Sequence, residues 1–379
     1  MPHGVAGPAR MWAVGLGPEP LFQEARATAD QPDDHPGAQV HVMYVVPADG
    51  SDERLDLHGT IAGSVASFQA WFAAQSGGRR LRLDTFQGGL DITFVRLRES
   101  DARIRSSHQF VRDRIQEELI SAGFVDPSKL YAVYYGGSSS FSCGGAAWPP
   151  ELVGNVAAVY LKGEPPGARP CATNRVRRAD EQPGYWEFSM LHEIVHTLGA
   201  AATCAPHHTL AGHVSDDPRD LMYAGPLPWL SELLDVGRDD YYGHGRSNCL
   251  DVARSAFLEP SEADAELPPG WAEFQQRMAP GSQEQSDLQA QDCGFEGAAR
   301  SRDSETETTL VFVNQTRQAF QLFWLDFTGR RQFFAGLSPG QALTQRTFLT
   351  HPWLVADQLG QCVGIFLPVD RPARAVIRP

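Results

Sequence analysis

The sequence predicts an α+β protein, in which a larger domain built from a mixed sheet and helices precedes a small all-β sandwich domain. Strand and helix patterns alternate over residues 39–260, whereas only short strand patterns separated by turn signals occur in residues 309–379. Residues 261–308 are polar, acidic and interrupted by glycine and proline, which is typical of a linker. Residues 1–38, rich in Pro, Ala and Asp, are expected to form a loosely ordered leader.

The larger domain is predicted to follow the order strand, helix, strands, helix, strands. Its strands are rich in β-branched and aromatic residues, as in VHVMYVVP, which favours a buried sheet. Its first helix places Ile61, Val65 and Phe68 at helical spacing and stops at Gly77. The predicted strands are 40–47, 81–86, 91–97, 129–137 and 155–161, and the predicted helices are 60–78 and 106–124.

Composition and charge exclude some classes of partner. The net charge of −14 disfavours nucleic acid and anionic membrane surfaces, because both repel an acidic protein. No stretch approaches the roughly 20 apolar residues that a membrane-spanning helix needs. We therefore expect neither nucleic-acid binding nor a membrane span.

The six cysteines are even in number and contain no CxxC pair, which suits disulfides better than a structural zinc site. Cys143–Cys171 and Cys204–Cys249 are hypothetical pairs, and such bonds indicate an extracellular protein. The alternative is six buried free thiols in a cytosolic protein. The apolar run after Arg10 is too short and too interrupted by Gly and Pro for a clear signal peptide.

The stretch LHEIVHTLG carries the strongest chemical signal. His192 and His196 are four residues apart, so on a helix both imidazoles face the same side and can reach one Zn²⁺ ion. Glu193 lies beside the first histidine, where a carboxylate can act as general base toward water activated by the metal. The flanking residues are apolar, and two histidines and a glutamate are costly to bury there without a metal.

This stretch resembles the metzincin metalloproteases, whose pattern is HExxHxxGxxH/D followed by a methionine turn. Gly199 matches the glycine after the helix, and DPRDLMYAG looks like the methionine turn, with Met222 below the metal. The resemblance implies a metzincin-like fold and peptide-bond hydrolysis with Zn²⁺ as cofactor. The sequence departs from the pattern at Ala202, where the family has its third ligand.

Several downstream residues can replace that ligand, since a catalytic zinc normally has three protein ligands. His213 is favoured because it follows Gly212 and lies shortly before Met222. His208 and then His207 are the alternatives, and Asp216 and Asp217 also remain candidates. A different clan, the gluzincins, would instead use a glutamate on a later helix, for which the nearest candidate is Glu232 in PWLSELLDVG.

The segment after the methionine turn offers two further functions. Tyr241, Tyr242 or His244 could stabilise an oxyanion, as tyrosines do at this place in some metzincins, although core packing is the commoner fate of such residues. Acidic residues in the same segment could hold Ca²⁺, although their spacing is not that of an EF-hand. These acidic residues are Asp235, Asp239 and Asp240.

The C-terminal segments LVFVNQTRQAFQLFWLDFTGRRQFF, LSPGQ and TFLTHPWLVAD resemble the β-domain of the von Hippel–Lindau tumour suppressor across residues 309–370. That family binds a hydroxyproline-containing peptide. By position, Trp324 and Trp353 are the implied aromatic walls of the pocket, and His351 and Thr347 are implied to bond the hydroxyl group. Aromatic faces suit a proline ring, and a buried hydroxyl needs hydrogen-bond partners.

One pocket position departs from this family, because Phe334 replaces a tyrosine.

The sequence as a whole predicts a secreted, zinc-dependent endopeptidase that hydrolyses peptide bonds. Its partner is a protein or peptide substrate, and the β-domain is expected to bind proline-containing or hydroxyproline-rich segments of it. The alternative is a non-catalytic zinc-containing binding protein whose β-domain recognises peptide ligands.

Overall fold

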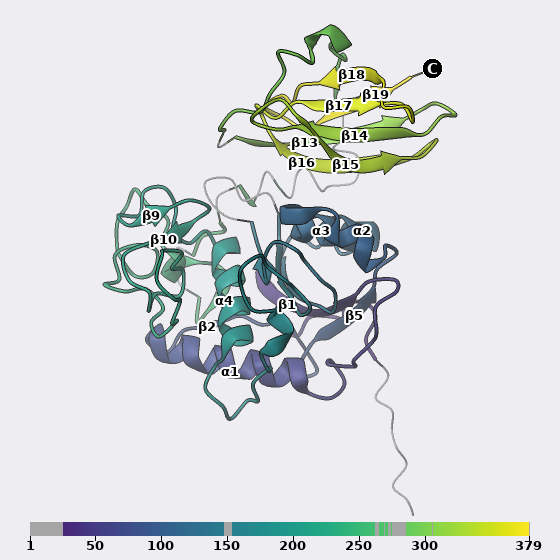
Figure 1. Cartoon of the computed structure of the whole chain (residues 1–379). Helices are drawn as coiled ribbons and strands as arrows, with labels where there is room; N and C mark the ends of the chain where they lie inside the picture. The colour runs from purple at the N-terminus through teal and green to yellow at the C-terminus, as the bar shows by residue number, and fades with distance from the viewer. Residues whose placement is uncertain are drawn as a thin grey trace, which may run out of the picture.

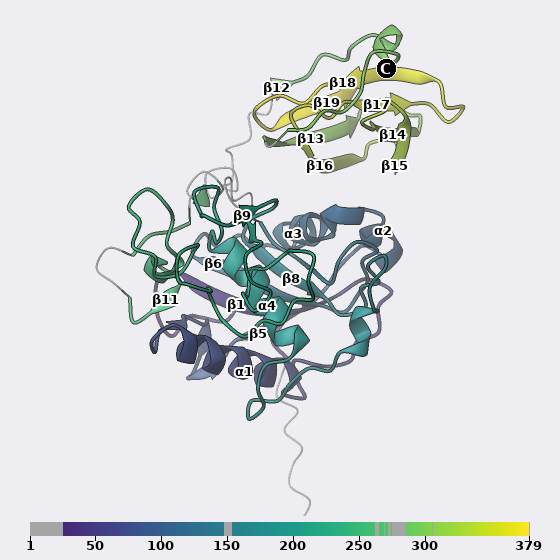
Figure 2. The same cartoon turned by 60° about the vertical axis from the view of Figure 1, so that its left-hand side comes forward.

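The protein was analysed as a computed structural model, which describes residues 26–147, 154–261, 265–268, 270–271, 274, 286–304 and 306–378. The first 25 residues of the predicted leader therefore lie outside the described residues. Two globular bodies are visible: a larger sheet-and-helix domain and a smaller β-domain, which in both views lies over the α2 and α3 end of the first (Figures 1 and 2). In the described residues, no helix is long and apolar enough to cross a membrane.

The larger domain is organised around a five-stranded sheet of order β5-β1-β6-β8-β7, in which β7 is an antiparallel edge strand and the others are parallel. Its helices are α1 (Thr60–Gln75), α2 (Asp101–Arg105), α3 (Val111–Ser121) and α4 (Tyr185–Thr197). Its strands are β1 (Gln39–Val46), β2 (Arg80–Leu81), β3 (Thr85–Phe86), β4 (Gly89–Leu90), β5 (Ile92–Arg96), β6 (Lys129–Tyr135), β7 (Gly144–Gly145), β8 (Val156–Tyr160), β9 (His208–Thr209), β10 (His213–Val214) and β11 (Leu258–Glu259).

Strand β1 is buried on both faces, as its predominantly apolar, β-branched sequence predicts for a central parallel strand. Val42 and Tyr44 point into the core formed with α1 and α4. Met43 and Val45 point into the opposite core, formed with α2 and α3. The sheet is therefore a middle layer between two helical layers, and the helix with the HExxH motif belongs to the first of them (Figure 1).

The predicted α+β class is confirmed, and most predicted elements are present, but two differ. The helix predicted for residues 106–124 begins at Val111, because His108 has a φ of 53° and interrupts the helical path after α2. Residues 81–86 form only the two short strands β2 and β3. Strand β2 pairs with β11 and so ties the start of the domain to its end.

A buried ion-pair network lies at the start of β6. The ammonium of Lys129, 1% exposed, is 2.6 Å from carboxylate oxygens of both Asp30 and Asp33 and 2.7 Å from Asp84. Asp84 is also 2.6 Å from Nδ1 of His41, a β1 residue. The network joins the first described residues to the central strands.

The β-domain consists of two four-stranded sheets that enclose an apolar core, in the orders β12-β19-β13-β16 and β15-β14-β17-β18. Its strands are β12 (Ser286–Asp287), β13 (Glu307–Asn314), β14 (Phe320–Leu325), β15 (Arg331–Leu337), β16 (Ala342–Phe348), β17 (Trp353–Ala356), β18 (Cys362–Phe366) and β19 (Ala373–Ile377). The C-terminal domain is all-β, as the sequence predicts. Strand β12 and Cys293 come from residues 261–308, yet both are bound to this domain.

All six cysteines form disulfides, which confirms the predicted Cys143–Cys171 and Cys204–Cys249 pairs and adds Cys293–Cys362. Cys204–Cys249 links the two ends of a long segment after α4 that contains little regular structure. Disulfides of this kind persist in oxidising, extracellular compartments. The alternative of six free thiols is wrong.

Candidate active site

Helix α4 presents the HExxH motif from inside the domain. Its N-terminus is held by Glu187, which accepts hydrogen bonds from the backbone N–H of Gly184 (3.0 Å) and from the Ser64 hydroxyl (2.8 Å). The helix ends at Thr197, and the φ of 96° at Gly199, two residues later, lets the chain turn away sharply. Because the helix is anchored at both ends, the imidazoles of His192 and His196 have fixed positions.

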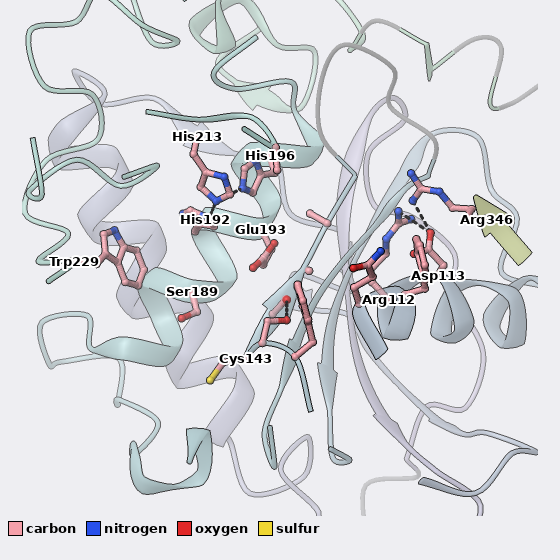
Figure 3. Close-up of a pocket in the computed structure, with 18 of the residues that line it drawn as sticks. Arg112, Asp113, Cys143, Ser189, His192, Glu193, His196, His213, Trp229 and Arg346 are labelled. Carbon is pink, nitrogen blue, oxygen red and sulfur yellow. Dashed lines mark hydrogen bonds and ion pairs between the residues drawn. The ribbon is translucent and has the colours of Figure 1, made fainter. Parts of the chain in front are cut away.

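His213, on strand β10, completes a group of three histidines whose Nε2 atoms converge (Figure 3). Its Nε2 lies 3.3 Å from Nε2 of His192 and 3.2 Å from Nε2 of His196. The Nδ1 of His192 is 2.7 Å from the Leu221 carbonyl, and that of His213 is 3.0 Å from the Leu210 carbonyl. A carbonyl accepts, so both Nδ1 atoms carry the proton and both Nε2 atoms present lone pairs.

These histidines fit a bound Zn²⁺. Lone pairs that face one another at these distances repel unless a cation lies between them. Ligands in a tetrahedron at about 2.0–2.1 Å from zinc are separated by about 3.3–3.4 Å, close to the observed spacings. Nδ1 of His196 is buried without a hydrogen-bond partner among the described residues, so coordination through Nε2 would be the main polar interaction of that ring.

Burial also keeps the three imidazoles neutral, the form that binds metals. Burial and the neighbouring His213 lower the pKa of His192 to about 3. Burial, together with His192 and His213, lowers the pKa of His196 well below its usual value, and burial lowers that of His213. The ligand set therefore does not have to lose protons at neutral pH before it binds a metal.

Glu193 points into the same cleft beside the histidines (Figure 3), and its carboxylate lies close to Gly144 of the edge strand β7. Burial raises the pKa of its carboxyl to about 8, an effect that the nearby Arg112 partly opposes. A side chain at Gly144 of β7 would place its Cβ only 2.4 Å from Glu193 Oε1 and 3.1 Å from the Ala158 carbonyl. Because Gly144 has no side chain, the Glu193 carboxylate can occupy this space.

Gly144→Ala is therefore expected to displace the Glu193 carboxylate and to lower kcat for peptide hydrolysis by about 10²-fold, since small misplacements of a catalytic group have effects of that size. Metal content should not change, because the three atoms nearest to the new methyl group belong to Glu193 and Ala158 and not to a histidine. Gly89→Ala is the matched control, since its Cβ would meet only the Phe86 carbonyl at 3.7 Å. Equal kcat values for the two variants would contradict this role of the glycine.

The segment predicted to form the methionine turn contacts His192, and its Met222 is fully buried. Asp220 holds this turn: its Oδ1 accepts hydrogen bonds from the Met222 backbone N–H (2.7 Å) and the Tyr241 hydroxyl (2.8 Å), and its Oδ2 accepts from the Val236 N–H (2.8 Å). The Leu221 carbonyl of the same turn orients His192. Sequence reasoning missed Asp220, although its place two residues before the methionine was a usable signal.

The other sequence candidates do not belong to the three-histidine group. His207 is bound to Asp240, with Nδ1 3.0 Å from Oδ2, and Nδ1 of His208 is 2.8 Å from the Ala201 carbonyl. Glu232 is exposed, and no helix forms around it, which removes the basis of the gluzincin alternative. Neither Asp216 nor Asp217 belongs to the three-histidine group.

The proposed oxyanion donors also point elsewhere. The Tyr241 hydroxyl bonds to Asp220, the Tyr242 hydroxyl to the Ser76 carbonyl at 3.3 Å, and Nε2 of His244 to the Leu250 carbonyl at 2.9 Å. The two tyrosines are core residues, which agrees with the core-packing alternative rather than with a role as oxyanion donors. The tyrosines that do line the cleft are Tyr185 and Tyr223.

The four side chains assigned to the β-domain pocket line one cavity of about 840 Å³: Trp324, Thr347, His351 and Trp353. The rings of Trp324 and His351 are 5.4 Å apart. Thr347 accepts a hydrogen bond from Nε1 of Trp353 at 2.8 Å and keeps its own proton for another partner. Phe334 packs edge-on against Trp353 with 5.0 Å between ring centres.

The β-domain cavity and the histidine cleft are neighbours. The cleft, of about 570 Å³, is lined by Glu193 and the three histidines but also by Arg346 and Phe348 of β16. Phe348, with Gln109 and Phe110 of the first domain, lines both cavities. An ion pair between Arg346 and Asp113 of α3 connects the two domains at this place (Figure 3).

Comparisons with known proteins give one family match and a weak structural likeness. Two crystal structures of OgpA from Akkermansia muciniphila align with the chain. The wild-type structure is 12% identical with a TM-score of 0.32, and the alignment covers 91% of this chain and 96% of OgpA. The structure of a catalytically inactive form with an O-glycopeptide substrate is 9% identical with a TM-score of 0.30, and the alignment covers 90% of this chain and 94% of that one. TM-scores this low carry no weight for fold or activity. No curated protein matches significantly. Residues 299–361 match the family described as VHL beta domain, which confirms the von Hippel–Lindau-like β-domain predicted for the C-terminal part of the chain.

Proposed function

We propose that the protein is a zinc-dependent endopeptidase of metzincin type, with His192, His196 and His213 as metal ligands and Glu193 as general base. The observation that carries this proposal is the convergence of three neutral imidazoles beside the half-buried Glu193, with Nε2 of His213 3.3 Å from Nε2 of His192 and 3.2 Å from Nε2 of His196. Structural zinc sites do not need such a base, which favours an enzyme over a non-catalytic binding protein. The three disulfides favour an extracellular location.

Bound Zn²⁺ would supply Lewis acidity, polarising the scissile carbonyl and acidifying the attacking water. Glu193 takes a proton from that water as it attacks and passes it to the leaving amine. Strand β7 offers the backbone of Gly144 and Gly145 at the sheet edge, where a substrate segment can pair as an additional strand. Such pairing directs the scissile bond between Glu193 and the histidines.

Metal analysis of two histidine variants tests the ligand set. His213→Ala is expected to lose the bound zinc on dialysis and to lose peptidase activity, because two imidazoles and water hold the ion poorly. His208→Ala is the matched control: it lies on the neighbouring strand, bonds only to the Ala201 carbonyl through Nδ1, and should keep both zinc and activity. Zinc retained by the first variant and lost by the second would refute the assignment.

We further propose that the β-domain pocket binds a proline or hydroxyproline residue of the same substrate chain that enters the cleft. Three cavity-lining residues shared by the two sites support a continuous path between them. Trp324 offers an aromatic face to the ring. Thr347 can donate a hydrogen bond to a hydroxyl group, while His351, kept neutral by burial that lowers its pKa, can donate or accept.

His351→Ala is tested with two peptides that differ only in having hydroxyproline or proline at one position. The variant is expected to bind the hydroxyproline peptide about 5–10-fold more weakly than wild type does, the effect of one lost hydrogen bond, whereas its affinity for the proline peptide should fall much less. Calorimetric titration of both peptides into the Glu193→Gln protein measures this without cleavage. His58→Ala, at an exposed position of the first domain, is the control. Equal affinity of wild type for the two peptides would remove hydroxyproline from the proposal.

A further inference from the structure

Besides the three-histidine group, a group of acidic residues lies in the segment after the predicted methionine turn. Carboxylate oxygens of Asp235, Asp239 and Asp240 all lie within 4.8 Å of one another. Asp235 and Asp240 are nearly inaccessible, with exposed fractions of 7% and 1%, whereas Asp239 is half-buried. Three acidic groups held this close repel one another strongly unless a proton or a cation neutralises them.

The carboxylate of Asp235 has one satisfied and one unsatisfied oxygen. Its Oδ2 accepts hydrogen bonds from the backbone N–H groups of Tyr241 (2.8 Å) and Tyr242 (2.6 Å). Its Oδ1 is buried and has no hydrogen-bond partner among the described residues. Buried polar atoms are rarely left unsatisfied, so this oxygen indicates a ligand that the protein atoms do not supply.

Protein cations do not balance the group. Within the described part of the chain, no Lys or Arg forms an ion pair with Asp235, Asp239 or Asp240. The imidazole of His207 contacts Asp240, with Nδ1 3.0 Å from Oδ2. Burial, with a contribution from Asp240, raises the pKa of Asp235 to about 6, as expected for a carboxylate that lacks its counter-ion.

We propose that Asp235, Asp239 and Asp240 bind a Ca²⁺ ion. Three carboxylate ligands suit a hard cation rather than zinc. Calcium–oxygen distances of about 2.3–2.6 Å allow ligands on opposite sides of the ion to be almost 5 Å apart, which accommodates the observed spread. Mg²⁺ requires a near-ideal octahedron at about 2.0–2.1 Å and keeps several of its waters, so it is usually bound by one or two carboxylates rather than by three.

The site is joined to the candidate zinc centre through two short connections. Asp235 holds the backbone of Tyr241, whose hydroxyl bonds to Asp220, the residue that pins the methionine turn. Asp240 holds the backbone N–H of His207 at 2.9 Å. The next residue, in strand β9, pairs with β10, which carries His213.

Calcium should therefore stabilise the irregular segment closed by Cys204–Cys249 and, through it, the position of His213. The calcium site itself does not depend on the proposed peptidase activity. The coupling between the two ions does, because it rests on zinc being held by the three histidines.

Calcium titration of the full chain tests the proposal. The protein is freed of divalent ions and titrated with Ca²⁺ by calorimetry, with thermal unfolding measured in parallel. We expect one Ca²⁺ per chain, a dissociation constant on the order of 10⁻⁴ M or below, and a rise in Tm with calcium. Asp239→Asn should weaken calcium binding by about tenfold or more, because it removes one ligand charge at the most accessible position.

Asp180→Asn, at an exposed position elsewhere in the domain, is the matched control and should bind calcium as the wild type does. No saturable calcium binding by the wild type, or unchanged affinity in Asp239→Asn, would overturn the site. Mg²⁺ that raises Tm as strongly as Ca²⁺ at equal concentration would overturn the choice of ion. A zinc titration with and without calcium then tests the coupling: tighter zinc binding in its presence is expected, and equal affinity refutes the link while leaving the calcium site intact.

Discussion

Glu193→Gln is expected to lower kcat for peptide hydrolysis by about 10²–10⁴-fold, the usual contribution of a general base. The amide preserves the shape of the side chain but cannot take a proton from water. Zinc content should stay at the wild-type level, because the metal is held by histidines. The measurement is steady-state hydrolysis of an unstructured protein substrate, with metal analysis of the same samples.

Glu232→Gln is the control for that experiment, since this exposed glutamate is in the same domain and outside the cleft. The Glu232→Gln protein should cleave the same substrate at the wild-type rate. A Glu193→Gln protein that binds zinc and cleaves as fast as wild type contradicts the assigned mechanism. A wild-type protein that binds zinc and cleaves nothing would support the binding-protein alternative.

Lys129→Met is expected to destabilise the larger domain by about 3–5 kcal/mol, the effect of removing one partner from a buried ion pair. Its ammonium is 1% exposed and contacts three carboxylates, those of Asp30, Asp33 and Asp84. Burial opposes the charge of Lys129, yet these carboxylates raise its pKa overall. Urea denaturation at neutral pH measures the loss.

The chain has one other lysine, Lys162, which supplies a matched control because its ion pair with Glu53 is half exposed. Lys162→Met should change stability by about 0–1 kcal/mol.

The stability difference should also depend on pH. Burial raises the pKa of Asp84, but hydrogen bonds from His41 and Lys129 outweigh this effect and hold the pKa below 3.8. A lowered pKa stabilises the fold above pH 4 and this contribution is lost below it, so the difference between wild type and Lys129→Met should shrink in acid.

The parts of the site that the sequence could predict are those within regular elements. His192, Glu193 and His196 lie on one helix, where the period of 3.6 residues determines which side chains share a face. The β-domain was likewise recognisable, because its sequence resembles a known family whose model matches residues 299–361. Local sequence determines these features almost completely.

The remaining parts depend on tertiary contacts. His213 could be ranked above His208 but not assigned, since the segment that carries both is positioned by the Cys204–Cys249 disulfide and by the β9–β10 pair. The chain near Cys293 had a polar, acidic composition that indicated a linker, and a bond to Cys362 made it part of the β-domain. Hydroxyls such as that of Tyr241 could not be assigned because their partners are distant in sequence.

The cleft is lined both by β7 and by Phe348 and Arg346 of the β-domain, which has a consequence for which proteins the proposed peptidase would cleave. A substrate that pairs with a sheet edge must be extended, and a compact domain cannot enter between two domains in that form. Intact proteins would then be cut at termini, linkers and segments that unfold locally. Their susceptibility would follow the free energy of local opening as much as the residues at the cleavage site.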